Sequence, residues 1–450
     1  MAITNAYLAG VLETVKKRNA GEPEFIQAVT EVLECLQPVV EKRPDLVEAG
    51  VIDRLVEPER QIIFRVPWVD DNGKVQVNRG FRVQYNSAIG PYKGGLRLHP
   101  SVYIGIIKFL GFEQVFKNSL TTLPMGGGKG GSDFDPKGKS DGEVMRFCQS
   151  FMTELCKHIG PDCDVPAGDI GTGAREIGYM FGQYKRIRNE FTGVLTGKGL
   201  TYGGSLARTE ATGYGVVFTL REALKYYGHK IEDVKVAVQG FGNVAQYTVE
   251  MLNKLGAKVA GVSCWDKADR CAYTYVKESG VLYSELIAAT DKYGSIDKEK
   301  AAELGYERLA GDEWMKLPVD VLIPAALDRA ITEDNCDQVS STVKMIVEGA
   351  NGPTTPAAEK ALIERGVILV PDFLANAGGV SCSYFEQVQC NMNYYWEREE
   401  VLDKLEKLMV TAALAVFDLA KERNVSLRDA AYMIAIDRVV KACRIRGWIR

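Results

Sequence analysis

The chain has 450 residues, which is too long for one ordinary domain and predicts two or three. Apolar residues make up 46% and charged residues 25%, a composition typical of globular proteins. The net charge of −4 argues against nucleic acid or an anionic membrane as a partner. No stretch reaches the roughly 18 uninterrupted apolar residues of a membrane span, and the first residues lack the apolar core of a signal peptide. We therefore expect a cytoplasmic protein.

Cysteines and histidines predict neither disulfides nor a metal site. The ten cysteines are scattered without a C-x-x-C pair, so we expect reduced thiols in a cytoplasmic protein. The three histidines show no paired spacing, so no protein-ligated metal is expected.

Helices are expected first, over 7–19 and 23–40, where apolar residues recur on one face. Three strands are then expected, at 61–68, 74–78 and 80–85. Lys93 follows the last of these strands and precedes two glycines, so we place it on a loop that leaves a sheet.

A helix with a broad apolar face is expected over 102–118. Gln114 and Lys117 are three residues apart and share a face of it. A surface ion pair between Glu113 and Lys117 is one interpretation. A polar edge that faces a cleft is the other.

The stretch from Thr121 to Ser140 contains six glycines around or just after Lys129. Glycine lets the backbone pass close to a ligand. A flexible surface loop with a solvated lysine is the simpler interpretation. If Lys93, Lys117 and Lys129 converge on one cleft, each lowers the pKa of the others, and a neutral lysine is a general base or nucleophile.

Asp169 lies in the glycine-rich stretch 160–173, between two expected helices at 141–159 and 174–188. It reads either as an ordinary Asp-Gly turn or, beside a neutral lysine, as a proton shuttle.

A dinucleotide-binding unit is predicted after Gly203. A buried strand at 234–239, the turn Gly240-x-Gly242-x-x-Ala245, a helix to Leu255 and a second strand at 258–263 follow one another. This order favours a pyrophosphate bound on the helix N-terminus. Further parallel strands are expected at 319–324, 345–348 and 367–370, and long helices at 396–423 and 426–446.

The motifs GPYKGGLR, PMGGGKGG, VPAGDIGTGAREIGYM, GFGNVA, EGANGPTTP and LANAGGVSCSYFE run in order along the chain. Together they resemble glutamate dehydrogenases of the hexameric bacterial type, within the Glu/Leu/Phe/Val dehydrogenase superfamily. The resemblance implies an α/β fold of two domains around a cleft. One is a mixed-sheet substrate and oligomerisation domain (1–202, joined by 426–450), and the other is a Rossmann-like domain (203–425). It also implies a homohexamer.

The reaction implied is reversible oxidative deamination of L-glutamate to 2-oxoglutarate and ammonium with NAD or NADP. By resemblance, Lys129 activates water and Asp169 moves protons at the amino nitrogen. The resemblance also implies the other roles: Lys117 and Gln114 bind the α-carboxylate, and Lys93 and Ser383 bind the side-chain carboxylate. The pocket walls are formed by Ala167, Thr196 and Val380. The cofactor's pyrophosphate is bound by Gly240, Gly242, Asn243 and Val244, and its nicotinamide side is contacted by Thr212, Asn351 and Asn376.

Two alternatives stay open. In a dehydrogenase of an apolar amino acid, the Lys93 ammonium would have no partner, so Lys93 and Ser383 argue against it. A nucleotide-binding regulator without chemistry would not need both Lys129 and Asp169.

The cofactor is expected to be NAD or NADP. NAD-specific folds often end the second strand with an acid that binds the ribose hydroxyls, and here that position is Cys264. Asp266 follows closely and could partly replace the acid, while Lys267 and Arg270 could attract a 2′-phosphate. We therefore expect both cofactors to be used, with a real share for NADP.

Overall fold

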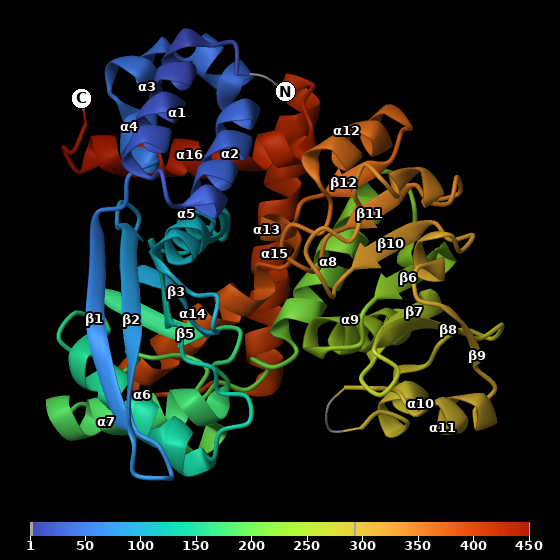
Figure 1. Ribbon diagram of the computed structural model, residues 1–450. Coiled ribbons are helices and arrows are strands. Elements are labelled where there is room, and N and C mark those ends of the chain that lie inside the picture. The colour runs from blue at the N-terminus through green and yellow to red at the C-terminus, as the bar shows by residue number, and fades with distance from the viewer. Residues whose placement is uncertain (1–2, 292–293, 450) are drawn as a thin grey trace. The chain divides into compact units, whose positions relative to one another are not determined.

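The computed structural model describes residues 3–291 and 294–449 and divides the chain into two compact units (Figure 1). Unit 1 comprises the chain as far as Arg208, then Val380–Val401 and the residues from Tyr432 on. Unit 2 comprises Thr209–Gly379 and Leu402–Ala431. Each unit is built on its own β-sheet.

This division differs from the expected boundaries at the C-terminal side. The expected Rossmann domain, 203–425, includes residues 380–401, which belong to unit 1. They belong there because helix α14 (Gly378–Met392) bonds to unit 1 along its length: Gln389 Nε2 donates to Ser205 Oγ at 2.8 Å, and Asn391 Oδ1 accepts from the Gly193 amide at 2.9 Å. Helical periodicity marks the helix but not the unit on which it packs.

Unit 1 contains a five-stranded mixed sheet of order β1-β2-β4-β3-β5. Its strands are β1 (Arg60–Val69), β2 (Val75–Asn86), β3 (Tyr92–Leu98), β4 (Gly127–Ser132) and β5 (Asp164–Gly168). β2 pairs antiparallel with β1 and β4, whereas β3 runs parallel to both β4 and β5. The carboxyl ends of three parallel strands therefore meet at one edge of the sheet.

Two residues that we expected on loops, Lys93 and Lys129, lie in strands β3 and β4. The sequence GGKGGS has no apolar alternation, which is why it reads as a loop, but its backbone pairs on both sides. Glycine is needed for this pairing because a Cβ added at Gly94 would lie 1.8 Å from the Gly128 carbonyl oxygen. The run of glycines is a close approach of backbones, not a flexible loop.

Helices complete unit 1 (Figure 1). They are α1 (Ala6–Arg18), α2 (Pro23–Lys42), α3 (Pro44–Glu48), α4 (Val51–Leu55), α5 (Ile104–Leu120), α6 (Asp141–Leu155), α7 (Ala174–Arg188), most of α14, and α16 (Leu427–Ile445) from Tyr432 on. The core lies between the sheet and helices α6 and α7, with Phe134 stacked on Phe147 at 3.8 Å. Helix α6 begins at a capping box in which Ser140 and Glu143 bond each other's backbone amides.

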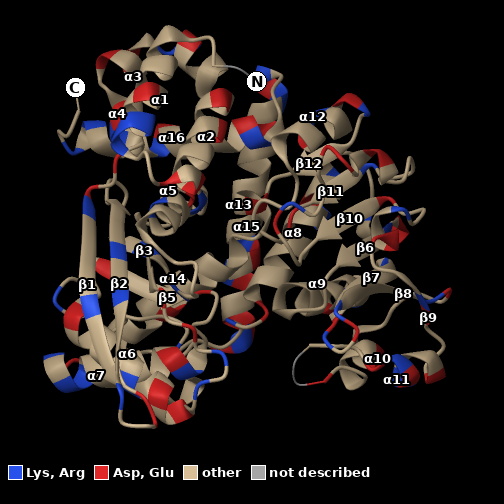
Figure 2. Ribbon diagram, viewed as in Figure 1, with Lys and Arg blue, Asp and Glu red and all other residues tan. Residues whose placement is uncertain are grey.

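Figure 2 marks arginine residues along β1 and β2 in blue, and these residues differ in burial. Arg60, Arg65 and Arg79 are exposed, whereas Arg82 is buried. The Arg82 guanidinium binds both carboxylate oxygens of Asp164 on β5, with Nε 2.9 Å from Oδ2. A buried charge pair with two parallel bonds ties β2 to the far edge strand.

Unit 2 contains a seven-stranded sheet of order β12-β11-β10-β6-β7-β8-β9. Its strands are β6 (Lys235–Gln239), β7 (Lys258–Asp266), β8 (Cys271–Val276), β9 (Glu307–Ala310), β10 (Val321–Pro324), β11 (Met345–Val347) and β12 (Ile368–Val370). The first five strands of that order are parallel to one another, whereas β8 pairs antiparallel with β7, and β9 pairs antiparallel with β8. This parallel core between helices is the predicted dinucleotide-binding arrangement.

Helices accompany this sheet in unit 2 (Figure 1). They are α8 (Ala211–Tyr226), α9 (Asn243–Lys254), α10 (Tyr283–Ala288), α11 (Lys298–Glu303), α12 (Pro356–Glu364), α13 (Asp372–Ala375) and most of α15 (Arg398–Arg423). One core cluster joins Ala237, Leu322 and Ile346 of the central strands to Leu362 of α12. Across the described residues of both units, no helix combines the length and apolarity needed to cross a membrane.

Candidate active site

Lys129 and Asp169 lie next to each other in unit 1. Lys129 projects from β4 and Asp169 follows β5, and Lys129 Nζ lies 3.5 Å from Asp169 Oδ1. Arg97 of β3 reaches the other carboxylate oxygen of Asp169, with Nε 3.0 Å from Oδ2. Three neighbouring strands thus bring the amine of Lys129, the carboxylate of Asp169 and the guanidinium of Arg97 into contact.

The surroundings shift both titrating groups. Burial lowers the pKa of the Lys129 ammonium, and the charge of Arg97 adds to this effect while Asp169 opposes it. Burial alone would raise the pKa of the Asp169 carboxyl, but the charges of Lys129 and Arg97 outweigh it, so the pKa lies below its usual value. Asp169 is therefore ionised, and Lys129 releases its proton more readily than a surface lysine.

Lys93, Thr196 and Ser383 form a second buried cluster. Lys93 Nζ donates to Thr196 Oγ1 at 2.8 Å, and that hydroxyl lies 2.6 Å from Ser383 Oγ. Lys93 is 1% exposed and Ser383 2% exposed. Lys93 and Ser383, which the family resemblance assigns to the same group of the substrate, both contact Thr196.

Burial lowers the pKa of Lys93 to about 7. The charge of Glu386 opposes this shift, while Arg208, Lys198 and Arg82 add to it. A carboxylate that binds here would stabilise the charged form of Lys93, because it would replace the solvation that burial removes from the ammonium.

Gln114 and Lys117 lie on one face of α5 and both are half-buried. Gln114 Nε2 donates to Asn118 Oδ1 at 2.7 Å. Asn118, which the sequence analysis missed, donates to the carbonyl oxygens of Lys93 at 3.0 Å and Gly126 at 2.6 Å. It joins α5 to the strands that carry both lysines, and its only sequence signal is the four-residue spacing from Gln114.

Two glycines let these groups approach one another. A Cβ added at Gly94 would lie 3.2 Å from Gln114 Cγ, and one at Gly95 would lie 2.7 Å from Asp169 Cβ. Ala167, on β5, pairs with Gly95, and Val380 is half-buried near the start of α14. All nine residues predicted for catalysis and substrate binding therefore lie in unit 1.

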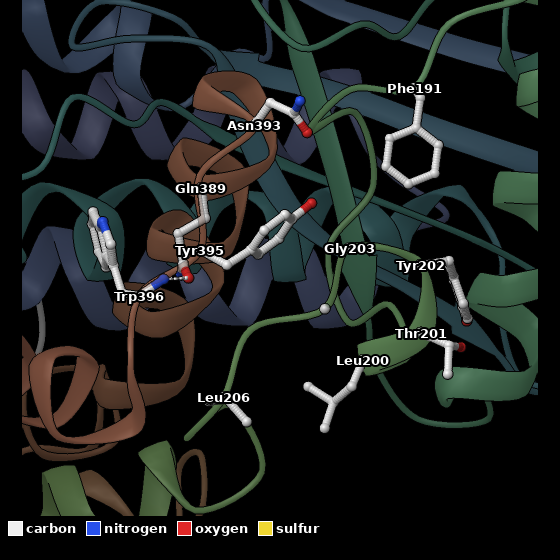
Figure 3. A pocket seen from close by; sticks show the side chains of 11 residues that line it. Phe191, Leu200, Thr201, Tyr202, Gly203, Leu206, Gln389, Asn393, Tyr395 and Trp396 are labelled. Atoms are coloured by element: carbon white, nitrogen blue, oxygen red, sulfur yellow. Dashed lines mark hydrogen bonds between the residues drawn. The ribbon is translucent and has the colours of Figure 1, made fainter.

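A separate hollow of about 390 Å³ lies elsewhere in unit 1 (Figure 3). Its lining consists of Phe191, Leu200, Thr201, Tyr202, Gly203, Gly204, Leu206, Gln389, Asn393, Tyr395 and Trp396. These residues supply neither a cation nor a carboxylate, so the hollow lacks the groups that hold a charged substrate. The catalytic candidates are the lysine clusters.

The predicted pyrophosphate residues sit at the turn between β6 and α9 in unit 2. Gly240 has φ of +94°, which only glycine adopts readily, and its amide donates to Ser263 Oγ at 3.1 Å. Gly242 is the N-cap residue of α9, and both Gly242 and Asn243 are exposed there. Asn243 Nδ2 donates to the Thr209 carbonyl at 2.9 Å, and Val244 is half-buried. The open first turn of a 12-residue helix fits a phosphate group.

Asn351 and Asn376, also in unit 2, contact each other. Asn376 Nδ2 donates to Asn351 Oδ1 at 2.9 Å, while the buried Asn376 Oδ1 has no hydrogen-bond partner. Thr212 is half-buried in the first turn of α8. A buried acceptor without a donor fits a ligand that brings a donor, such as a carboxamide.

The end of β7 differs from the prediction. We expected the strand to stop at Ser263, so that Cys264 would face the ribose, but pairing with β8 extends it to Asp266. Cys264 is 4% exposed and its thiol donates to the Gly294 carbonyl at 3.2 Å. Asp266 accepts from the amides of Ala268 and Asp269, each at 2.8 Å, and lies 3.3 Å from Lys298 Nζ.

Known proteins resemble this chain over nearly its whole length. The family model "Glu/Leu/Phe/Val dehydrogenase, dimerisation domain" matches residues 58–186, and "Glutamate/Leucine/Phenylalanine/Valine dehydrogenase" matches 203–447. The chain is 49% identical to the NADP-specific glutamate dehydrogenase of Chlorella sorokiniana, over 99% of this chain and 85% of that one. It is 47% identical to the NAD(P)-specific glutamate dehydrogenase of Xylanibacter ruminicola, over 97% and 98%.

A solved structure, of Plasmodium falciparum glutamate dehydrogenase 2, superposes with a TM-score of 0.92 at 44% identity and covers 99% of both chains. The two family models match most of the chain, and these relatives align with nearly all of it. The chain therefore belongs to the glutamate/leucine/phenylalanine/valine dehydrogenase family.

Proposed function

We propose that the chain is a glutamate dehydrogenase that interconverts L-glutamate and water with 2-oxoglutarate and ammonium, using NAD or NADP. The observation that carries the choice of glutamate is the buried Lys93 ammonium with Thr196 and Ser383. A dehydrogenase of an apolar amino acid would leave this ammonium facing a hydrocarbon. The relatives reported above carry the name of the same activity.

Lys117, with Gln114 beside it, holds the α-carboxylate, and the Lys93 cluster holds the side-chain carboxylate. Together they fix both ends of the substrate and align its α-carbon. Asp169 takes a proton from the amino nitrogen. Lys129, in its neutral form, takes a proton from the water that adds to the iminium carbon, and its ammonium then stabilises the new oxygen. A dinucleotide held by Gly240, Gly242, Asn243 and Val244, with its nicotinamide side at Thr212, Asn351 and Asn376, would supply the hydride acceptor for this chemistry.

The cofactor proposal covers both NAD and NADP. Asp266 is satisfied by two backbone amides and Lys298, so it is not a bare carboxylate that repels a 2′-phosphate. Lys298 and the neighbouring Lys267 add positive charge. Among the relatives, one is named NADP-specific and another NAD(P)-specific.

We also propose a cytoplasmic homohexamer. The ten cysteines are free thiols, which suits a reducing compartment. Ile63, Val75 and Val77 on β1 and β2 are 57–62% exposed, within the segment matched by the family's dimerisation domain. Exposed apolar side chains of this kind support a contact with another copy of the chain. The proposed number of six subunits rests on the family resemblance.

Absorbance at 340 nm tests the activity directly. The purified protein is mixed with L-glutamate or L-norleucine and with NAD or NADP, and the reverse reaction is run with 2-oxoglutarate, ammonium and NADPH. Glutamate should be oxidised at least about tenfold faster than norleucine, since the lost charge-assisted contact is worth on the order of 1.5–3 kcal/mol. Faster oxidation of norleucine than of glutamate would make the protein a dehydrogenase of apolar amino acids. An absence of turnover in both directions would contradict the proposal that the protein is an enzyme.

A further inference from the structure

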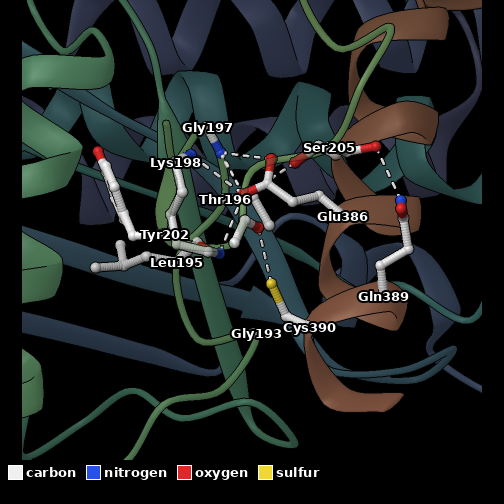
Figure 4. A network of polar contacts seen from close by, with 12 residues as sticks. Gly193, Leu195, Thr196, Gly197, Lys198, Tyr202, Ser205, Glu386, Gln389 and Cys390 are labelled. Atoms are coloured by element: carbon white, nitrogen blue, oxygen red, sulfur yellow. Dashed lines mark hydrogen bonds and ion pairs between the residues drawn. The ribbon is translucent and has the colours of Figure 1, made fainter. Parts of the chain in front are cut away.

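Glu386 is a fully buried carboxylate that the mechanism above does not use (Figure 4). It follows Ser383 by three residues on α14, so the two side chains share a face of that helix. Its oxygens accept from the Gly197 amide at 3.1 and 2.9 Å, and Oε1 also accepts from the Lys198 amide at 3.1 Å. All of these bonds go to the loop that carries Thr196.

Lys198 neutralises this carboxylate. Its Nζ lies 3.0 Å from Glu386 Oε1, and both side chains are buried. The same ammonium donates to the Leu195 carbonyl and lies 5.4 Å from the centre of the Phe181 ring. A buried ion is tolerated when it is paired and hydrogen-bonded, so the pair and the loop hold one another in place.

The position of the Thr196 hydroxyl depends on this arrangement. On one side the Thr196 amide donates to the Pro166 carbonyl of β5 at 3.0 Å. On the other side the chain turns at Gly197, whose φ is +92°, and the amides of Gly197 and Lys198 donate to Glu386. The hydroxyl between these two anchors accepts from Lys93 and meets Ser383.

Glu386 also acts on Lys93 through its charge. Burial is the largest influence on the Lys93 pKa and lowers it. Among the charged groups around Lys93, Glu386 has the largest effect and raises the pKa, whereas Arg208, Lys198 and Arg82 lower it. Without the carboxylate, the pKa of Lys93 would fall below its value of about 7, and less of the amine would be protonated at neutral pH.

We propose that Glu386 is a positioning residue for recognition of the substrate's side-chain carboxylate: it fixes Thr196 and faces Lys93 with negative charge, without itself touching the substrate. This inference rests on the proposed function, in which the Lys93 cluster binds that carboxylate. It predicts a selective effect. Substrates with a distal carboxylate depend on Glu386, whereas substrates that lack one do not.

The test compares Glu386→Gln with the unaltered enzyme, using L-glutamate and L-norvaline between pH 6 and 9. The amide still accepts bonds from Gly197 and Lys198 but carries no charge. We expect KM for glutamate to rise by about tenfold or more, the usual effect of losing a charge-assisted contact, while kcat and both KM values for norvaline and the cofactor stay within about threefold. The preference for glutamate over norvaline should begin to fall at a lower pH than in the unaltered enzyme.

Three further variants keep the test decisive. Asn391→Ala is the matched control, because Asn391 holds the same loop at Gly193 without a charge, and its KM values should not change. Glu386→Asp restores the charge and should recover part of the affinity for glutamate. If Glu386→Gln does not fold, the double variant Glu386→Gln/Lys198→Met removes both buried charges. Their effects on the pKa of Lys93 oppose one another, so the pH profile should change little, but the KM for glutamate alone should still rise because the ion pair that holds the Thr196 loop is lost.

An active enzyme in which Glu386→Gln, or the double variant, keeps the KM for glutamate within twofold and keeps its pH profile would overturn the positioning role alone. An equal loss with glutamate and norvaline would also overturn it, since that pattern indicates general damage to the site. If the unaltered protein does not oxidise glutamate, the proposed function itself fails and this inference fails with it.

Discussion

Lys129 Nζ lies 3.5 Å from Asp169 Oδ1, in a site where burial lowers the pKa of the lysine while the carboxylate stays ionised. A lysine that releases its proton more readily than a surface lysine and an ionised carboxylate within reach are the two groups that deamination requires. The first two predictions separate their roles.

Lys129→Ala should lose about 10²–10⁴-fold in kcat, the usual contribution of a general base. Binding of NADPH should persist, because Lys129 belongs to unit 1 and the predicted dinucleotide turn to unit 2. Steady-state rates at 340 nm and NADPH fluorescence titration measure the two effects. Near-normal turnover of a folded variant would remove Lys129 from the catalytic role.

Asp169→Asn keeps the shape of the side chain and removes its charge. We expect a folded enzyme with a kcat reduced by about 10²-fold or more and a KM for glutamate within about threefold. Arg97 loses its carboxylate partner, so Arg97→Lys serves as a control for that contact. A variant that raises KM and leaves kcat unchanged would make Asp169 a binding residue.

The pH dependence of substrate preference reports Lys93. Its pKa of about 7 means that the amine is protonated below pH 7 and loses its proton as the pH rises. The ratio of kcat/KM for glutamate to kcat/KM for norvaline should be constant below pH 7 and should fall by up to about tenfold per pH unit above it. Lys129 acts on both substrates and cancels in the ratio. A constant ratio up to pH 9 would show that Lys93 stays charged or does not bind the side-chain carboxylate.

Replacing the polar cluster should change the substrate. Lys93→Leu with Ser383→Val removes two polar partners of the side-chain carboxylate and leaves the Thr196 hydroxyl between two apolar side chains. We expect activity with glutamate to fall by about tenfold to a hundredfold, with norleucine or methionine relatively favoured. The specificity ratio kcat/KM for the two substrates is the measurement. A double variant that still prefers glutamate would mean that other groups hold its carboxylate.

Cofactor preference should respond to Lys298, which pairs with Asp266 at 3.3 Å and with Asp269 at 2.5 Å. Lys298→Gln leaves both acids without this cation, so kcat/KM should shift from NADP toward NAD by about tenfold. Lys300→Gln, on the same helix, is the matched control and should leave the ratio unchanged. An unchanged ratio in Lys298→Gln would place the 2′-phosphate elsewhere.

Cys264→Glu should affect the stability of the fold, because Cys264 is buried. The side chain is buried against the segment at Gly294, so a glutamate there would be desolvated and would lower the melting temperature. Thermal unfolding of Cys264→Glu and Cys264→Ser should show the loss only for the charged variant. Equal melting temperatures would mean that the position can reach solvent.

The sequence predicts the dinucleotide unit well because its signals are local: a buried strand, two glycines and a helix occupy adjacent residues. Lys93 and Lys129 were expected on loops because strand patterns are read from side chains, whereas β4 is a strand by backbone pairing of glycines. Glu386 gives no local signal at all. It reads as one acid in a helix, and its role depends on Gly197 and Lys198, which lie far away along the chain and next to it in space.

The glycine pair at 94–95 decides how this site can be altered. Cβ atoms there would meet Gly128 and Gln114 on one side, and Gly168 and Asp169 on the other. Each reacting side chain can be replaced by another that fits the same space. The distance between the backbones that carry these side chains cannot be changed in this way, because it depends on the absence of a Cβ at both glycines. A library that randomises the pocket should therefore yield new specificities at Lys93 or Ser383, while Gly94 and Gly95 return as glycine in every active clone.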